Sequence, residues 1–333
     1  MGSGLFGHRQ QVVLADLSHQ LGVIALHVHL HDCYRVSRCL APGDEAALTD
    51  DLLGHGSPRC VDPACPTRTP AVSDILLAAT LTHQASTRIQ ICGRLAVEIA
   101  GQPVTELIPK RQGRLLFTFL VLNRHRNSSR EELVDALWAE EVPPDADGTL
   151  SSVLSRLRRA VGFERVQGRG EVRLLLPADT WIDFEAAEEA VHRAESAIAH
   201  GQWARAWGPS LVALFTARRG LLRGEDLSWI EPHRRRLEEI HCSALESYTA
   251  SALGLGGGEL HVGERTAREL IEHAPYRESG YRLLMEILAA RGNFAEALRV
   301  YEQLRTLLRE ELGATPSPPI QALHVQLLKQ AGG

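Results

Sequence analysis

Long apolar runs and a secretory signal are both missing from this 333-residue chain. A membrane-spanning helix needs about 20 consecutive apolar residues, and no segment approaches that length. The first ten residues do not place a basic segment before an apolar core, as a secretory signal does. The six cysteines lack the dense spacing of a disulfide-rich secreted domain. We therefore expect a cytoplasmic protein with reduced thiols and no membrane partner.

Sequence signatures of catalysis are missing as well. The chain has no Gly-Lys dipeptide and therefore no phosphate-binding P-loop. It also lacks the G-x-S-x-G motif of serine hydrolases and the H-E-x-x-H motif of zinc proteases. The histidines of the C-terminal half, His233, His241, His261 and His273, are interpreted as surface groups or satisfied core groups. We expect no enzyme activity, no cofactor and no metal site.

Aromatic residues make up only 5% of the chain, whereas Ala, Leu and Arg are plentiful, which favours helices. The formal net charge of -5 argues weakly against a nucleic-acid partner. Positive charge is nevertheless concentrated, because residues 148–173 contain six arginines and only two glutamates. Binding to DNA depends on the cations that reach phosphates, so this local stripe matters more than the total charge.

The stretch from Asp147 to Gly162 predicts an amphipathic helix, with Asp147 as its N-cap and Gly162 as a left-handed C-cap. Apolar residues recur at helical spacing along one stripe, namely Leu150, Leu154, Leu157 and Val161. Hydroxyls and guanidiniums occupy the opposite face, namely Ser151, Ser152, Ser155, Arg156, Arg158 and Arg159. Such a face suits the major groove of DNA, but it is equally compatible with a solvated surface. The helix alone does not decide between the two.

The neighbouring segments favour DNA binding. Alternating apolar residues over 88–99 and a turn at 101–102 predict a small antiparallel sheet. Helices are expected over 109–122 and 129–139, the second with overlapping capping boxes at its start. A β-hairpin with a Gly-Arg-Gly turn follows, carrying Arg165, Arg169 and Arg173. This order is the layout of a winged helix, in which helix and hairpin present arginine to the same side.

Residues 89–182 resemble the winged-helix domain of response regulators and of the Streptomyces antibiotic regulatory protein (SARP) family. The resemblance is carried by PKRQGRLLFTFLVLNRHRNSSREELVDALW (109–138) and GTLSSVLSRLRRAVG (148–162). It implies that helix 148–161 enters the major groove, that hairpin 165–174 touches the minor groove, and that loop 139–147 faces RNA polymerase. It places Arg156 and Arg158, together with the three serines, in the groove and makes Arg159 a phosphate contact. The family's wing usually ends in Gly-Tyr, where this chain has Glu171-Val172.

From Asp183 onward the chain is expected to be helical. Amphipathic helices are predicted over 183–200, 202–219 and 229–253. Gly258 and Gly292 begin similar segments 34 residues apart, which is the tetratricopeptide period. The predicted helix pairs are 259–274 with 277–290 and 293–312 with 318–330. This half resembles the bacterial transcriptional activation domain of the SARP family through WIEPHRRRLEEIHCSALE (229–246) and HAPYRESGYRLLMEILAARGNFAEALRVYEQLRTLLREELGATPSP (273–318).

Residues 1–87 lie outside this resemblance. Their cysteines are spaced C-x5-C at 33 and 39 and C-x4-C at 60 and 65, with histidines nearby. Zinc sites usually repeat a tighter spacing, so unliganded thiols in a partly disordered extension are preferred to a structural zinc site.

The sequence thus predicts a mainly α fold with a small β component. The expected domains are an N-terminal extension (1–87), a winged-helix DNA-binding domain (88–182) and a tetratricopeptide-like activation domain (183–333). The favoured function is a transcriptional activator that binds double-stranded DNA. The resemblance implies a homodimer on direct repeats near promoters of an antibiotic gene cluster, in contact with RNA polymerase holoenzyme. The alternative is a helical-repeat adaptor whose winged helix binds protein, and salt-dependent duplex binding discriminates between them.

Overall fold

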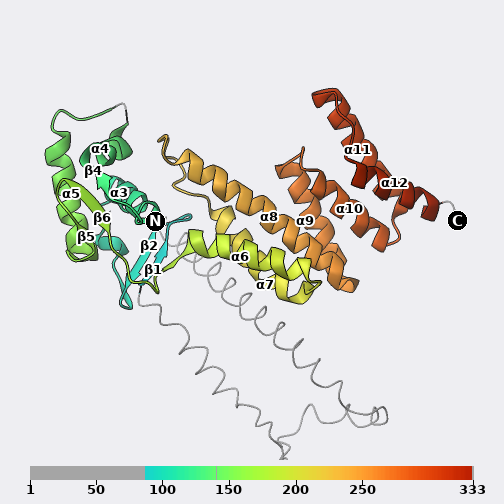
Figure 1. Cartoon of the computed structure of the whole chain (residues 1–333), viewed down its shortest axis with the longest axis horizontal. Helices are drawn as coiled ribbons and strands as arrows, with labels where there is room; N and C mark the ends of the chain where they lie inside the picture. The colour runs from blue at the N-terminus through green and yellow to red at the C-terminus, as the bar shows by residue number, and fades with distance from the viewer. Residues whose placement is uncertain (1–86, 140, 332–333) are drawn as a thin grey trace, which may run out of the picture. The chain divides into compact units, whose positions relative to one another are not determined.

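The computed structural model describes residues 87–139 and 141–331, and every structural statement below refers to these residues. They form two small sheets and a series of helices (Figure 1), so the predicted mainly α fold with a small β component is confirmed. The expectations for Cys33, Cys39, Cys60 and Cys65, and for the rest of 1–86, lie outside the described residues. So does Glu140, which belongs to the loop expected to face RNA polymerase.

The first sheet contains the predicted antiparallel strands. β1 (Thr87–Gln90) pairs with β2 (Ala96–Ile99), and β2 pairs with β3 (Gln102–Pro103). A fourth strand that the sequence did not predict, β7 (Trp181–Ile182), lies parallel to β1 at the other edge. The turn between β2 and β3 lies one residue earlier than expected, at 100–101, where both residues have positive φ.

Three helices complete the predicted winged helix. They are α3 (Arg111–Leu122), α4 (Arg130–Trp138) and α5 (Ala146–Val161), and the short 3-10 helix η2 (Thr105–Leu107) precedes them. One of the two possible capping boxes forms, because the Ser129 hydroxyl accepts from the Glu132 amide while the Glu132 carboxylate accepts from the Ser129 amide. The second box does not form, because the Ser128 hydroxyl is buried and has no hydrogen-bond partner in the described residues.

The hairpin after α5 forms as predicted and gains a third strand. β5 (Val166–Gln167) and β6 (Glu171–Leu174) are antiparallel, with Val166 opposite Leu174. β4 (Ser128–Ser129), which directly precedes α4, pairs with the outer edge of β6. The hairpin is therefore attached to the start of α4 as well as to α5.

The second half consists of helices that pack on their neighbours in chain order, as repeat helices do (Figure 1). The predicted bounds agree with the observed ones to within a few residues. The helices are α6 (Asp183–Ala199), α7 (Trp203–Arg219), α8 (Glu231–Leu255), the short 3-10 helix η3 (Gly257–Glu259), α9 (Leu260–His273), α10 (Glu278–Ala290), α11 (Phe294–Leu312) and α12 (Pro318–Ala331). Among the described residues, none of these helices is long and apolar enough to cross a membrane.

The winged helix shares one apolar core with the first repeat helices. Asp183, at the start of α6, is fully buried, and its carboxylate accepts from the backbone amides of Ile91 (2.8 Å) and Cys92 (3.1 Å). Trp229 donates its indole N–H to the Ala136 carbonyl and packs edge-on against Phe119. A second core lies among α9, α10, α11 and α12. The boundary at residue 183 therefore runs through a continuous core, and its status as a domain boundary stays a prediction.

Candidate nucleic-acid interface

Helix α5 begins at a different cap from the one predicted. The Asp145 carboxylate accepts from the Gly148 amide at 3.1 Å, so Asp145 is the N-cap and the prediction of Asp147 is wrong. Asp147 lies inside the first turn and binds Arg130 instead. Gly162 does end the helix with positive φ (109°), but its ψ of 136° is outside the left-handed helical region that was predicted.

The two faces of α5 differ as expected. The predicted stripe of Leu150, Leu154, Leu157 and Val161 is at most 2% exposed, which confirms its place in the core. The opposite face is exposed at Ser151, Ser152, Ser155, Arg156 and Arg159, whereas Arg158 is half-buried. The helix therefore presents one continuous polar surface outward.

Arg158 is half-buried because the hairpin lies over it. Its Nε donates to the Val166 carbonyl at 2.9 Å and its Nη2 donates to the Gly168 carbonyl at 2.5 Å. Burial, together with the positive charges of Arg130 and Arg169, lowers the pKa of Arg158. Three guanidiniums thus gather where α5 meets the hairpin, and Arg158 fixes the hairpin to the helix.

Arg130 is a functional candidate that the sequence reasoning missed. It is the first residue of α4, and its Nε donates to Asp147 at 2.6 Å. Its Nη2 donates to the Ser151 hydroxyl at 2.8 Å, and its Nη1 donates to the Arg169 carbonyl at 3.2 Å. A cation is unfavourable at a helix N-terminus, so its position there was a signal of an outside partner. Arg130 joins α4, α5 and the hairpin turn.

The three predicted hairpin arginines have different surroundings. Arg165 is half-buried, where it donates to the Val161 carbonyl at 3.0 Å and pairs with Glu164. Arg173 is exposed and donates to the Arg124 carbonyl at 3.2 Å. Arg169 lies at the exposed tip, and its guanidinium has no hydrogen-bond or ion-pair partner among the described residues. Only Arg169 is therefore free to reach outward without breaking a contact.

The tip itself depends on a glycine. Gly168 has a φ of 91°, and a Cβ at this position would lie 1.7 Å from the Glu171 carbonyl oxygen. The two residues that replace the family's usual Gly-Tyr differ in burial. Val172 is fully buried, whereas Glu171 is exposed. The Glu171 carboxylate accepts from the Asn127 side chain at 2.8 Å. This hairpin therefore carries an acidic group beside its arginines.

A second group of cations lies at the C-terminal half of α5. Lys110, Arg156 and Arg159 line a shallow cavity of about 410 Å³. The Arg156 Nε makes one long bond to the Ser152 carbonyl (3.4 Å), and Arg159 has no polar partner in the described part of the chain. Open cations around a depression suit an anion such as a phosphate.

The loop between α4 and α5 is shorter than predicted, since α5 already begins at Ala146. Ala139 has a φ of 45°, and Val142 is 48% exposed beside exposed Glu141. Asp145, which lies in the loop expected to face polymerase, caps α5. Among the described residues of this loop, Glu141 and Val142 are therefore the side chains without a structural role. Which of all these side chains touch DNA or polymerase stays a prediction.

Comparison with known proteins gives this arrangement a family context. The family described as bacterial transcriptional activator domain matches residues 182–328. Regulatory protein AfsR of Streptomyces griseus is 33% identical over 223 residues, which are 66% of this chain and 22% of AfsR. Regulatory protein DnrI of Streptomyces peucetius is 26% identical over 258 residues, which are 74% of this chain and 93% of DnrI. The chain thus spans about a fifth of AfsR but nearly all of DnrI.

A solved structure extends the comparison to the fold. The structure of Mycobacterium tuberculosis EmbR in complex with a low-affinity phosphopeptide has a TM-score of 0.63 and 25% sequence identity. The match covers 74% of this chain and 65% of that one. The arrangement of a winged helix followed by helical repeats is therefore shared with EmbR.

Proposed function

The chain belongs to the SARP family, and on that premise we propose that it is a sequence-specific DNA-binding transcriptional activator. The observation that carries the proposal is the polar face of α5, whose exposed arginines lack acidic partners and lie beside the basic hairpin. A helix of this kind fits the major groove, where guanidiniums and hydroxyls meet base edges and phosphates.

The proposed DNA contacts fall into base-reading and phosphate-binding residues according to their position. Ser151, Ser152, Ser155 and Arg156 face outward along α5 and take the base-reading positions. Arg159 and Lys110 border the same depression and take phosphates, and Arg169 takes a phosphate beside the minor groove. Arg158 was expected to face the groove, but its bonds to two hairpin carbonyls give it a positioning part in this proposal.

The proposed target rests on the family resemblance. AfsR and DnrI are named regulatory proteins, and DnrI is matched over almost its whole length. We extend this to promoters of a secondary-metabolite gene cluster, bound at direct repeats by two copies side by side. Loop 139–145 then faces RNA polymerase holoenzyme through Glu141 and Val142.

The test begins with selection of a preferred duplex from a randomised pool, followed by anisotropy titrations over a range of salt concentrations. The logarithm of the binding constant should fall steeply with the logarithm of salt, by about 0.9 for each phosphate contacted. Arg156→Ala should cost about 1–3 kcal/mol and relax the preference at one base pair. Arg299→Ala, which removes an exposed arginine from α11, is the matched control and should change neither.

Two outcomes would overturn the proposal. If the purified chain selects no duplex, the adaptor interpretation replaces DNA binding. If Arg156→Ala binds the selected duplex as well as the wild type, α5 is not the reading helix.

The polymerase contact needs a separate test. Glu141→Ala and Val142→Ser should lower transcript yield in vitro while DNA affinity stays unchanged. Asp145 is unsuitable here, because losing the N-cap would cost about 1 kcal/mol of helix stability. Unchanged transcript yield in both variants would remove loop 139–145 from the proposal.

A further inference from the structure

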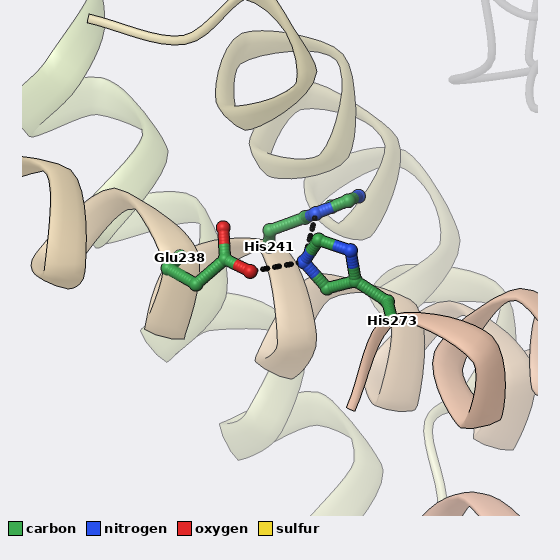
Figure 2. A group of neighbouring side chains, drawn as sticks. All are labelled: Glu238, His241 and His273. Atoms are coloured by element: carbon green, nitrogen blue, oxygen red, sulfur yellow. Dashed lines mark hydrogen bonds and ion pairs between the residues drawn. The ribbon is translucent and has the colours of Figure 1, made fainter. Parts of the chain in front are cut away.

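Two histidines and a glutamate meet between α8 and α9, far along the chain from the winged helix (Figure 2). Glu238 and His241 lie one turn apart on α8, and His273 is the last residue of α9. The Glu238 carboxylate pairs with Nε2 of His273, and Nδ1 of His241 lies 3.1 Å from the same nitrogen. One candidate ligand atom from each residue lies within 4.8 Å of the other two.

His241 is the most enclosed of the three side chains. Its side chain is only 12% exposed, and its Nε2 is buried without a hydrogen-bond partner. A buried polar nitrogen without a partner is costly and calls for an explanation. That nitrogen lies 4.0 Å from a carboxylate oxygen of Glu269, which in turn pairs with Arg218. A histidine with a carboxylate behind its second nitrogen is the usual arrangement around protein-bound zinc.

The cluster is also accessible. Glu238, His241 and His273 line one side of a cavity of about 670 Å³, so an ion and a water molecule can reach the three side chains from solvent. Burial, and next to it the charge of His273, lower the pKa of His241.

We propose that Glu238, His241 and His273 bind a single divalent ion of the zinc class. Two imidazole nitrogens and one carboxylate are a ligand set that zinc takes together with water. Mg²⁺ and Ca²⁺ prefer sites made of oxygen atoms and do not fit. Glu238 and Glu269 offset the charge of the ion, and the Glu269 carboxylate lies 4.0 Å from Nε2 of His241, on the side away from the ion. The sequence analysis expected no metal site, and the three residues come from two helices, so no spacing motif in the sequence brings them together.

An ion at this position would link α8 to α9 and replace the ion pair between Glu238 and His273. The expected consequence is a higher melting temperature in the presence of Zn²⁺, since a ligand that binds only the folded state stabilises it. The inference goes beyond DNA binding and does not depend on it.

The test uses the full chain after removal of any affinity tag. Zn²⁺ is titrated in a calorimeter, and Co²⁺ is used as a spectroscopic substitute. We expect one ion per chain at this site, with the visible bands of a Co²⁺ ion bound by nitrogen and oxygen. Thiolate-to-cobalt bands would instead identify ions held by cysteines, such as those at 33, 39, 60 and 65. The number of such ions is subtracted from the total stoichiometry, so that the two kinds of site are counted separately.

Three variants locate the ion. His241→Ala, His273→Ala and Glu238→Gln should each abolish binding at this site and the thermal shift that accompanies it. Glu238 is exposed, so Glu238→Gln tests the site without disturbing the core. His261→Ala, which removes an exposed histidine from α9, is the matched control and should bind as the wild type does. Glu269→Gln should weaken binding by about 10–100-fold.

The proposal is overturned if the wild type takes up no Zn²⁺ or Co²⁺ at micromolar concentration. It is also overturned if Glu238→Gln and His273→Ala keep the full stoichiometry with a nitrogen and oxygen spectrum, because the ion would then lie elsewhere.

Discussion

Arginines in two regions of the molecule have opposite surroundings. Along α8 to α11 the arginines are mostly paired with glutamates of the same or a neighbouring helix. Examples are Arg268 with Glu264 and Glu296, Arg277 with Glu239 and Glu246, Arg282 with Glu286, and Arg305 with Glu302. On α5 and the hairpin, the arginines without a carboxylate partner in the described residues are Arg156, Arg158, Arg159, Arg169 and Arg173.

This difference explains why net charge is a poor guide to the partner. Many acidic groups of the repeats pair with arginines, and the net charge of -5 does not show where the unpaired cations lie. The arginines of α5 are not neutralised by carboxylates in the described residues. Positive charge that is not neutralised attracts a polyanion such as DNA. An arginine that already has a carboxylate stabilises the fold, whereas one without a carboxylate is available to an outside anion.

The largest expected effect comes from reversing the unpaired charges. Arg156→Glu combined with Arg159→Glu should abolish measurable duplex binding, because each lost contact costs about 1–3 kcal/mol and each new carboxylate repels phosphate. Anisotropy at low salt measures the loss. Arg265→Glu on α9 combined with Arg299→Glu on α11 makes the same change of charge at two exposed positions of the repeats and should leave duplex binding intact. Equal losses in both proteins would mean that overall charge, and not the surface of α5, governs binding.

A smaller effect is expected at Arg158, where the guanidinium binds protein and not solvent. Arg158→Ala removes two charge-assisted hydrogen bonds to the hairpin and should lower the free energy of unfolding by about 1–2 kcal/mol, after allowance for partial exposure. DNA binding should weaken for all sequences alike, because the hairpin is no longer held against α5. Urea denaturation and binding to a set of mutated duplexes measure the two effects.

The base preferences distinguish Arg158 from its neighbour. Arg156→Ala should alter the preference at one position, whereas Arg158→Ala should preserve the ranking of all duplexes. A changed ranking in Arg158→Ala would return that side chain to the base-reading set that the family resemblance implies.

Removing a paired arginine from the repeats should affect stability alone. Arg277 binds Glu246 at 2.6 Å and Glu239 at 3.3 Å, and both ion pairs are partly exposed. Arg277→Ala should therefore lower the free energy of unfolding by about 1 kcal/mol or less. Duplex affinity, measured on the same preparation, should match that of the wild type. A loss of affinity larger than the loss of stability would contradict the division between the two regions.

The sequence predicts most of the fold because its signals are local. Amphipathic periodicity places the repeat helices within a few residues of their observed bounds, and the stripe from Leu150 to Val161 is buried as expected. The strands β4 and β7 were missed because two residues carry no periodicity. Their existence depends on partners β6 and β1, which lie far away in the sequence.

The site is less predictable, because tertiary contacts decide between equivalent residues. Asp145 and Asp147 both satisfy the rule for an N-cap, but Arg130 of another helix takes Asp147. Arg156 and Arg158 are two residues apart and lie at opposite edges of the polar face of α5, and the return of the hairpin covers the edge with Arg158. No pattern within α5 contains that information.

The smallest expected effect concerns Glu171, the acidic group among the unpaired cations of the hairpin. Its carboxylate accepts from Asn127 at 2.8 Å, so the side chain has a neutral partner and keeps its negative charge near the surface proposed for DNA. Glu171→Gln keeps the shape and removes the charge, and duplex affinity should rise by about 0.2–1 kcal/mol with a steeper dependence on salt. The matched control is Glu302→Gln on α11, which pairs with Arg305 and should leave affinity unchanged. Unchanged affinity in Glu171→Gln would place the hairpin strand away from the phosphates and leave only its tip, at Arg169, as a contact.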